Sequence, residues 1–350
     1  MSIERNPIPY AFPFNFQDEM VQIGVRKGMG YANKYGELVT PCTYDVAYPF
    51  SEGLAFAQKG DKGVFIDKAG KEVLSGDYED ADIFSEGLAG VEKDGKWGFI
   101  NKAGKLVIPY QYDDIYWFRE GLCGVFKEDK AGYIDTEGNV AVPFIYDDVF
   151  CFCEGLGQVS KNNRWGYIDT GGNIVIPIEY DSAGDCRNGL VCVEKRGKAG
   201  VLDKAGKEII PFTYEFADDT FSEGLLIVRS NEKYGCINEK GEVTIPFRYH
   251  NLRTFKEGLA VAENNYKWGF IDKDNNPIIP FQYDKASDFC NGLAFVKTKG
   301  RKAYYIDKNN EVNIVLKREY GKVEKITAAM AVIVAAGIAT FLVKMILNLL

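Results

Sequence analysis

Side chains able to act as nucleophiles or to transfer protons are few in this chain. His250 is the only histidine, and it stands where equivalent stretches carry an aspartate, so we interpret it as a loop residue. A Ser-His-Asp triad, a Cys-His pair and a multi-histidine metal site all need a working histidine. No glycine-rich loop of a nucleotide-binding type occurs either. With 50 acidic residues, a catalytic pair of carboxylates is possible by number alone. The prominent acidic residues, however, recur at regular places along the chain that suit turns. We therefore predict a non-enzymatic protein without a cofactor.

The eight cysteines could in principle bind a metal or form disulfides: Cys42, Cys123, Cys151, Cys153, Cys186, Cys192, Cys236 and Cys290. Most of them stand where other stretches carry Ala, Val, Phe or Ser, so we interpret them as small buried or half-buried residues. Cys151 and Cys153 are a close pair, but C-x-C without further ligands is a weak metal signal. We predict no metal site, and scattered thiols fit a reducing cytosol.

Two sets of basic residues recur at fixed spacing along the chain, and we call each such set of equivalent positions a column. The first is Lys62, Lys96, Lys130, Arg164, Lys198, Lys233, Lys267 and Lys302. The second is Lys59, Lys93, Lys127, Lys161 and Lys195. Aligned by stacking, each column would form a basic stripe that could hold an acidic peptide, a nucleotide or a headgroup. Alternatively, the first column forms ion pairs with the glutamate of a recurring Glu-Gly-Leu motif, and the second is solvated turn surface.

Two further sets of residues are candidates for partner binding. Tyr116, Trp117 and Phe118 form an aromatic cluster that occurs once in the chain. Large aromatic residues often anchor protein interfaces, so Trp117 and Tyr116 are the predicted anchor. Phe118 stands in a column of phenylalanines and is expected in the core. A repeat protein can also select its partner through positions that vary among otherwise similar repeats. One such variable column is therefore a candidate binding surface: Phe56, Gly90, Gly124, Gln158, Cys192, Ile227, Val261 and Phe295.

These columns belong to a repeat with a step of 34 or 35 residues. One marker is the residue that follows a tryptophan column: Gly30, Val64, Gly98, Gly132, Gly166, Gly200, Gly235, Gly269 and Tyr304. A second is Glu-Gly-Leu or Asn-Gly-Leu, at 52–54, 86–88, 120–122, 154–156, 188–190, 223–225, 257–259 and 291–293. A third is Pro-x-x-Tyr, which begins at Pro41, Pro109, Pro143, Pro177, Pro211, Pro246 and Pro280. Three markers with one period indicate units that bury their apolar faces against one another.

The repeated pattern W-G-[FY]-I-[DN]-x-x-G-x-x-[IV]-I-P-x-x-Y resembles the WG (KWG) repeat of bacterial proteins over residues 19–316. The full Trp-Gly pair is present at Trp97, Trp165 and Trp268, and the other copies carry different residues in the Trp column. The resemblance implies β-rich binding or scaffold modules, with no shared catalytic residues.

Within one repeat we expect three strands, at 97–101, 105–109 and 122–127. Gly104 should supply the positive φ of the first hairpin, and the Asp or Asn before the turn should bind its backbone amides. Pro109 should close the second strand because it has no amide for the ladder. Residues 112–120 are expected to cross the unit as a loop or a short helical turn. The third strand then pairs with the next repeat.

The predicted fold is all-β: a tandem array of about eight 34-residue, three-stranded antiparallel repeats, plus one C-terminal α-helix. The array could be an open solenoid or superhelix, or a closed propeller-like ring. We divide the chain into an N-terminal cap and partial repeat at 1–27, the array at 28–316, a basic linker at 317–325 and a transmembrane helix at 326–350.

The C-terminal segment differs sharply in composition from the repeats. Residues 326–343 carry no charge, and about 20 apolar residues span a bilayer. A core helix packed on the repeats is the alternative, but the segment has no polar face. Basic residues at 317–325 favour an array in the cytoplasm, with the C-terminus outside the inner membrane. Small residues on one face could let the helices self-associate into an oligomer: Ala331, Ala335, Gly337 and Ala339.

The net charge of −8 makes general nucleic-acid binding a poor first hypothesis. The sequence therefore favours a membrane-tethered cytoplasmic scaffold whose array binds a protein partner. The alternative is a membrane effector, for example in bacterial antiphage defence. In that case the array senses a partner or ligand, and the C-terminal helices oligomerise to perturb the membrane.

Overall fold

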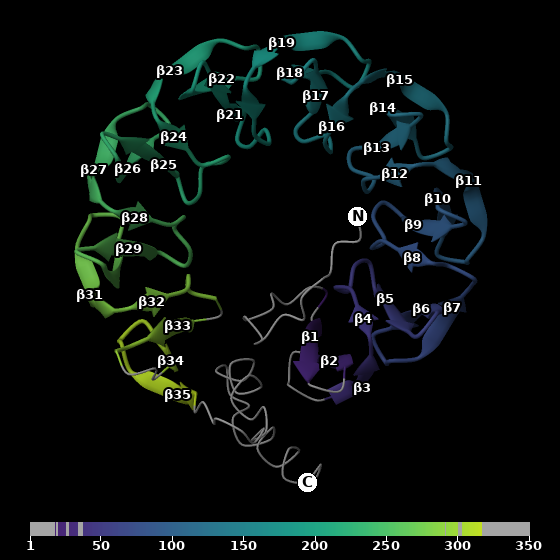
Figure 1. Cartoon of the computed structure of the whole chain (residues 1–350), viewed down its shortest axis with the longest axis horizontal. Helices are drawn as coiled ribbons and strands as arrows, with labels where there is room; N and C mark the ends of the chain where they lie inside the picture. Colours follow the sequence, from purple (N-terminus) through teal and green to yellow (C-terminus); the bar gives the residue numbers. More distant parts are fainter. Residues whose placement is uncertain are drawn as a thin grey trace. The chain divides into compact units, whose positions relative to one another are not determined.

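The computed structural model describes residues 18, 20–25, 28–33, 38–290, 292–299 and 303–316. All regular elements among these residues are β-strands (Figure 1). The first sheet of the described part is three-stranded and antiparallel, with β1 (Met20–Val25), β2 (Gly28–Asn33) and β3 (Leu38–Tyr44). Eight small four-stranded antiparallel sheets follow in tandem, which confirms the predicted all-β repeat array.

Each four-stranded sheet is built from consecutive strands of four kinds. The first is very short: β4 (Val46–Ala47), β8 (Asp80–Ala81), β12 (Asp114–Ile115), β16 (Asp148–Val149), β20 (Ser182–Ala183), β24 (Phe216–Ala217), β28 (Asn251–Leu252) and β32 (Lys285–Ala286). The second begins after the Glu-Gly or Asn-Gly motif: β5 (Leu54–Lys59), β9 (Leu88–Lys93), β13 (Leu122–Lys127), β17 (Gly157–Lys161), β21 (Leu190–Lys195), β25 (Leu225–Ser230), β29 (Ala260–Asn264) and β33 (Ala294–Lys297).

The third strand carries the Trp column in most sheets: β6 (Lys62–Asp67), β10 (Lys96–Asn101), β14 (Lys130–Asp135), β18 (Arg164–Ile168), β22 (Lys198–Asp203), β26 (Lys233–Asn238), β30 (Lys267–Ile271) and β34 (Ala303–Ile306). The fourth carries the Pro-x-x-Tyr motif in most sheets: β7 (Glu72–Ser75), β11 (Leu106–Tyr112), β15 (Val140–Tyr146), β19 (Ile174–Tyr180), β23 (Glu208–Tyr214), β27 (Val243–Tyr249), β31 (Pro277–Tyr283) and β35 (Val312–Leu316). As predicted, a sheet joins the end of one sequence repeat to the start of the next.

Two details of the predicted repeat are wrong. The segment expected to be a loop or helical turn contains the short strand β12, which pairs with β13, so the sheets have four strands rather than three. Pro109 does not close the second predicted strand, because β11 continues to Tyr112. The register shifts at this point, where Trp97 pairs with Tyr112 but Phe99 pairs with Ile108. Pro109 lies in this irregularity of an edge strand, where a missing amide is tolerated.

This bulge explains the glycine of the Trp-Gly pair. A Cβ atom on Gly98 would lie 2.7 Å from the Ile108 carbonyl oxygen and 2.9 Å from the Tyr110 nitrogen, because the bulged strand passes close to it. Val64 occupies the glycine column in one copy, and there the partner strand β7 is short and pairs Val64 directly with Ser75. Glycine is therefore required where the fourth strand bulges.

The predicted Asp turn between the third and fourth strands is confirmed. The Asp67 carboxylate accepts backbone hydrogen bonds from Ala69 and Lys71, both at 2.9 Å. Asn101 binds the equivalent amides of the next turn at 3.0 and 3.1 Å. Gly104 has a φ of 75°, as the hairpin requires.

The hydrophobic core lies between successive sheets. In one cluster, Phe99 and Ile108 come from the sheet of β8 to β11, and Cys123 and Val125 come from the next sheet. Phe118 is 1% exposed and packs edge-on against Phe99, as expected for its column. Within the second unit, neighbouring sheets thus bury their apolar residues against one another, which is the packing that a repeat array requires.

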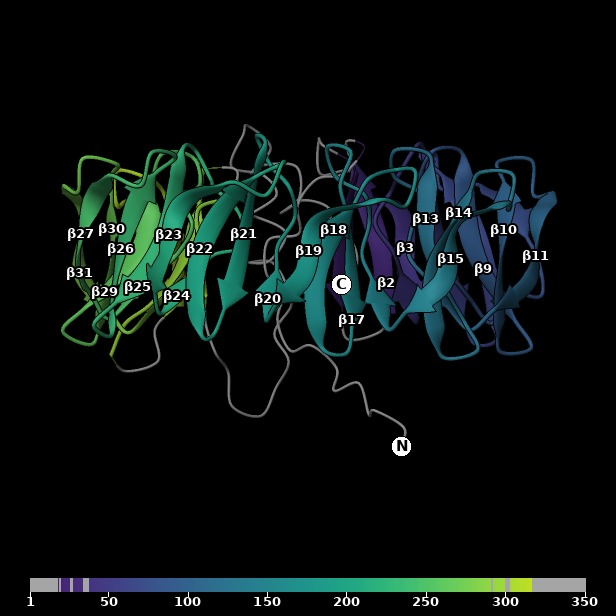
Figure 2. The ribbon, with the colours of Figure 1, turned by 90° about the horizontal axis from the view of Figure 1, so that it is seen from above.

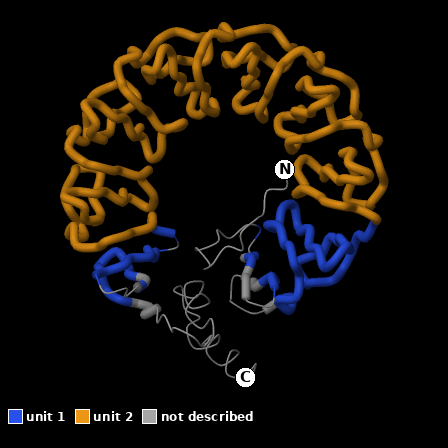
Figure 3. The backbone as a smooth tube through the Cα atoms, in the orientation of Figure 1, with its two compact units in different colours: residues 1–76, 289–350 blue, residues 77–288 orange. Residues whose placement is uncertain are grey.

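The chain forms two compact units, one of residues 1–76 with 289–350 and one of residues 77–288 (Figure 3). Within the second unit the sheets follow one another along an arc, with the long fourth strands on the outer side and the short first strands nearer the inner side (Figure 1). The strands of each sheet run side by side, and their turns lie at the two ends of the sheet (Figure 2).

Several predictions fall on residues outside the described part. They are the segment 1–17 of the cap, the basic linker 317–325, the helix 326–350 and its residues Ala331, Ala335, Gly337 and Ala339. Among the described residues, no helix is long and apolar enough to cross a membrane. In the described part of the cap, β1 pairs antiparallel with β2.

Candidate functional site

Each Glu-Gly-Leu motif forms a tight turn in which both central residues have a left-handed backbone. Glu154 has a φ of 52° and Gly155 a φ of 82°. Cys153 and Leu156 exchange both backbone hydrogen bonds across this turn, at 2.9 and 3.1 Å. Asn and Gly adopt positive φ more readily than Glu does. The reason for a glutamate here therefore lies in its side chain.

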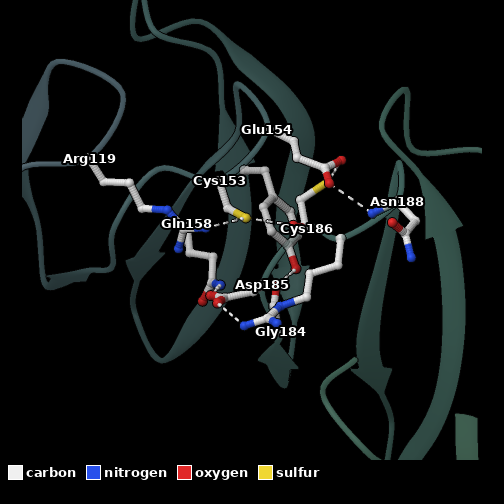
Figure 4. A network of polar contacts seen from close by, with 10 residues as sticks. Arg119, Cys153, Glu154, Gln158, Gly184, Asp185, Cys186 and Asn188 are labelled. Carbon is white, nitrogen blue, oxygen red and sulfur yellow. Dashed lines mark hydrogen bonds and ion pairs between the residues drawn. The ribbon is translucent and has the colours of Figure 1, made fainter. Parts of the chain in front are cut away.

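The glutamate of one turn binds the turn of the next repeat. Glu154 accepts backbone hydrogen bonds from Asn188 and Gly189, both at 2.8 Å (Figure 4). Glu120 binds the amides of Glu154 and Gly155 in the same way, at 2.6 and 2.7 Å. The amide of Gly189, together with that of Asn188, lowers the pKa of Glu154. The same contact recurs from Glu86 to Gly121 and from Glu223 to Gly258.

The basic residues before the Trp column do not pair with these glutamates, so that prediction is wrong. Four of them pair with an acidic residue 17 positions later: Lys96 with Asp113, Lys130 with Asp147, Arg164 with Asp181 and Lys267 with Asp284. Lys62 pairs instead with Glu72. Asp113 also accepts a hydrogen bond from the backbone N–H of Glu128, at 2.7 Å, in a turn of the next sheet. Its hydrogen bond from Lys96 lowers its pKa. The Asp113 carboxylate therefore connects two successive sheets. Its place in the sequence, between β11 and β12, did not reveal this role.

The glutamates of the Glu-Gly-Leu turns contact lysines from a different column. Lys273, in the turn after the third strand, lies 3.0 Å from the Glu223 carboxylate and donates a hydrogen bond to the Glu223 carbonyl oxygen. Lys204 donates to the carbonyl oxygen of Glu154. Both turns lie at the same end of their sheets, because the second and third strands are antiparallel.

The five predicted stripe lysines end the second strands but differ in their contacts. Lys93 lies 3.8 Å from Asp77, Lys127 donates to Gln111 at 3.3 Å, and Lys195 lies 2.9 Å from Glu179. Lys59 and Lys161 are exposed. In the second unit the column thus contains both ion-paired lysines and Lys161, whose charge helps to lower the pKa of Asp147. The variable column is not a surface: Phe56, Gln158, Cys192, Ile227 and Val261 are all buried, so that prediction is wrong.

Trp117 and Tyr116 lie at an exposed aromatic patch, which we define as Tyr116, Trp117, Phe150 and Trp165. Trp117 is 42% exposed and Phe150 is 36% exposed. The Tyr116 ring lies 6.2 Å from that of Trp117 and 5.5 Å from that of Phe150, and Phe150 stacks on Trp165 at 5.2 Å. The sequence indicated Trp117 and Tyr116 but not Phe150 and Trp165, which come from the next repeat.

Two carboxylates flank the aromatic patch. Burial raises the pKa of Asp148, and the charge of Asp114 adds to this rise. Burial also raises the pKa of Tyr116 to about 12, with further contributions from Asp148 and Asp114. Neither carboxylate forms an ion pair among the residues that the structure describes. The patch is therefore apolar at its centre and acidic at its side.

The cysteines and the histidine serve packing and local contacts. Arg119 donates to the Cys153 sulfur at 3.1 Å, and that thiol donates to the Cys186 carbonyl oxygen at 2.7 Å (Figure 4). Burial raises the pKa of Cys186 to about 12 and that of Cys151 to about 11, which makes both weak nucleophiles. His250 stacks on Tyr266 at 5.6 Å. No group of three or more potential metal ligands occurs within the described ranges.

A family model described as "WG containing repeat" matches eight consecutive segments of the chain: 29–62, 65–97, 97–130, 132–165, 165–198, 200–234, 234–268 and 268–301. The chain belongs to the WG-repeat family. No curated protein matches this WG-repeat protein. The family match confirms the resemblance that the repeated motif indicated.

Several solved structures resemble the WG-repeat array, and they are propeller-like. A structure titled "Crystal structure of the eukaryotic initiation factor" has a TM-score of 0.57 at 11% identity, covering 86% of this chain and 96% of that one. BamB from Moraxella catarrhalis has a TM-score of 0.43 at 10% identity, covering 72% and 93%. Hsv2p from Kluyveromyces lactis has a TM-score of 0.40 at 10% identity, covering 70% and 99%. At such identities the likeness concerns the fold alone.

Proposed function

We propose that this WG-repeat protein is a non-enzymatic scaffold that binds a protein partner at the aromatic patch, and that residues 326–350 tether it to the inner membrane. The observation that supports binding most directly is the exposure of Trp117 beside Tyr116 and Phe150. Aromatic anchors of this kind carry much of the binding energy in protein interfaces.

The aromatic patch lies where two sheets differ from the other sheets of the second unit at one repeated position. Tyr116 and Phe150 occupy the same place in successive sheets, where each backbone amide donates to the second strand. Other sheets of the second unit carry Asp82, Gly184, Asp218 and Arg253 there. A repeat array can create a binding site by such variation at one position. The aromatic pair therefore marks the sheets of β12 to β19 as the place of binding.

The charges beside the patch favour a cationic partner segment. Asp114 and Asp148 form no ion pair in the described part of the chain, and the charge of Asp114 adds to the burial that raises the pKa of Asp148. A lysine or arginine from a partner would relieve this repulsion and could also stack on the face of Trp117. We expect binding to weaken with added salt.

The test is a comparative affinity purification from the host with the full chain as bait. We expect Trp117→Ala to lower the recovery of specific partners at least tenfold. Tyr266→Ala is the matched control, because Tyr266 is an 81% exposed aromatic residue in a different sheet. Equal recovery of every partner by the wild type and the Trp117→Ala variant would overturn binding at the patch.

A further inference from the structure

One hairpin of the second unit concentrates positive charge beside a cavity. Lys195 ends β21, Lys198 begins β22, and Arg196 lies in the turn between them. Together with Phe212 of β23, these three residues line a hollow of about 350 Å³. Ligand pockets for small molecules begin near this size.

Arg196 is a departure from the repeat. The same place in other hairpins is occupied by residues that are acidic, or small and polar: Asp94, Glu128, Asn162, Asn231 and Asn265. Arg196 has a φ of 55°, in the left-handed region that Asn and Asp adopt more readily than other non-glycine residues. An unfavourable backbone conformation held by an unusual residue points to a role beyond folding.

Among the residues that the structure describes, two of the three cations lack a carboxylate partner. The acid 17 positions after Lys198 is Glu215, by analogy with Lys96 and Asp113. Glu215 instead accepts backbone hydrogen bonds from Asn231 and Glu232, at 3.0 and 3.1 Å, and lies 3.4 Å from Arg229.

In the described residues, neither Lys198 nor Arg196 forms an ion pair. The third cation, Lys195, is already 2.9 Å from Glu179 and lies over the Tyr180 ring. Asp181 is also near, because it accepts the Gly197 amide at 3.1 Å and pairs with Arg164. The uncompensated positive charge thus belongs to Arg196 and Lys198.

The remaining wall of the hollow is aromatic. Phe212 is half-buried and stacks on Tyr180, with ring centroids 6.1 Å apart and an interplanar angle of 20°. A half-buried ring gives an apolar surface on which a flat group can rest. Arginine presents several donors in one plane and suits phosphate oxygens, and lysine adds a point charge.

We propose that Arg196, Lys198 and Phe212 form a site for a small phosphate monoester that carries a flat ring, of the class of nucleoside monophosphates. Arg196 and Lys198 bind the phosphate oxygens, and Phe212 contacts the ring. This site is distinct from the aromatic patch, and neither proposal depends on the other.

The test measures binding of three probes to the full-length protein by calorimetry: adenosine monophosphate, glycerol phosphate and adenosine. We expect adenosine monophosphate to bind most tightly, since it alone offers both the phosphate and the ring. Equal binding of glycerol phosphate or of adenosine would overturn the ligand class. No binding of any probe would overturn the site.

Two variants assign the contacts. Arg196→Asn installs the residue that other hairpins carry at this place, so the fold should be retained, and we expect at least a tenfold loss of affinity for adenosine monophosphate. Glu128→Asn, at the same place in another hairpin, should leave the affinity unchanged. Phe212→Leu should abolish the preference over glycerol phosphate. Unchanged affinity in Arg196→Asn would contradict the proposal.

Discussion

At the scale of single residues, the recurring glutamate of the Glu-Gly-Leu turns joins neighbouring repeats. Glu154 contributes an unfavourable positive φ to its own turn, but its carboxylate binds two backbone amides of the next turn. Each such bond satisfies donors that the tight turn leaves unpaired. The glutamate therefore stabilises the connection between repeats rather than its own hairpin.

We predict that Glu154→Gln lowers the free energy of unfolding by about 0.5 to 1 kcal/mol at pH 7, because charged acceptors bind amides more strongly than neutral ones but this group is solvent-exposed. The pKa of Glu154 is lower in the folded than in the unfolded chain. Its stabilisation is therefore present above the unfolded pKa and is lost as the pH falls through the folded value. Urea denaturation at pH 7 and pH 3 measures this difference.

Glu128→Gln is the matched control for this experiment. Glu128 also has a left-handed backbone, with a φ of 52°, but its carboxylate accepts no hydrogen bond within the described ranges. We expect this variant to match the wild type at both pH values. A loss at Glu154 that persists undiminished at pH 3 would contradict the carboxylate–amide account.

Local turn chemistry could be predicted from the sequence, but contacts across repeats could not. Asp67 binds amides two and four residues away, and such a contact follows from the turn motif itself. Asp113 contacts Lys96 and the amide of Glu128, which are separated from it by 17 and 15 residues. The partner of Lys96 depends on how sheets stack, and a pattern of residue types does not specify that geometry.

At the scale of the element, the bulge in the fourth strand determines the Trp-Gly motif. We predict that Gly98→Ala lowers stability by about 1 to 3 kcal/mol, because its Cβ would lie 2.7 Å from a backbone oxygen. Gly171→Ala is the control: this turn position is alanine at Ala103 and Ala205, so no loss is expected. Thermal or urea unfolding measures both. Equal stability of the two variants would refute the role of the bulge.

The fourth strand of each sheet could be predicted only in part from the sequence. A strand was predicted at 105–109, after the turn at Gly104, and Pro109 was expected to end it. The chain passes the proline through a bulge and resumes pairing at Tyr112. The short strand β12 has only two residues, too few to show an alternation, and therefore escaped prediction.

At the scale of the whole molecule, the period of 34 or 35 residues was sufficient to predict a tandem β-array. Because apolar residues are buried between successive sheets, each sheet must resemble its neighbours. A repeated sequence pattern therefore indicates a repeated structural unit. Binding sites are the opposite case, since they arise where one copy differs. Trp117 was recognisable as such a departure, whereas its contact with Phe150 through Tyr116 depends on sheet stacking.

The membrane tether gives a prediction for the complete chain. Deletion of 326–350 is expected to move the protein from the membrane fraction to the soluble fraction, because the remaining chain lacks a comparable apolar segment. Fractionation followed by detection of an N-terminal tag measures this. A truncated chain that still sediments with membranes would contradict the tether. Depolarisation of cells that requires 326–350 would favour the membrane effector over the scaffold.

The most direct test of the central claim is site-specific photo-crosslinking in the host. A photoreactive phenylalanine at position 117 is compared with the same residue at position 266, since Trp117 and Tyr266 are both exposed aromatic residues. We predict a discrete protein adduct from position 117 that is absent from position 266 and that Asp148→Asn weakens. Identical adduct patterns from the two positions, or none from position 117, would contradict binding at the aromatic patch.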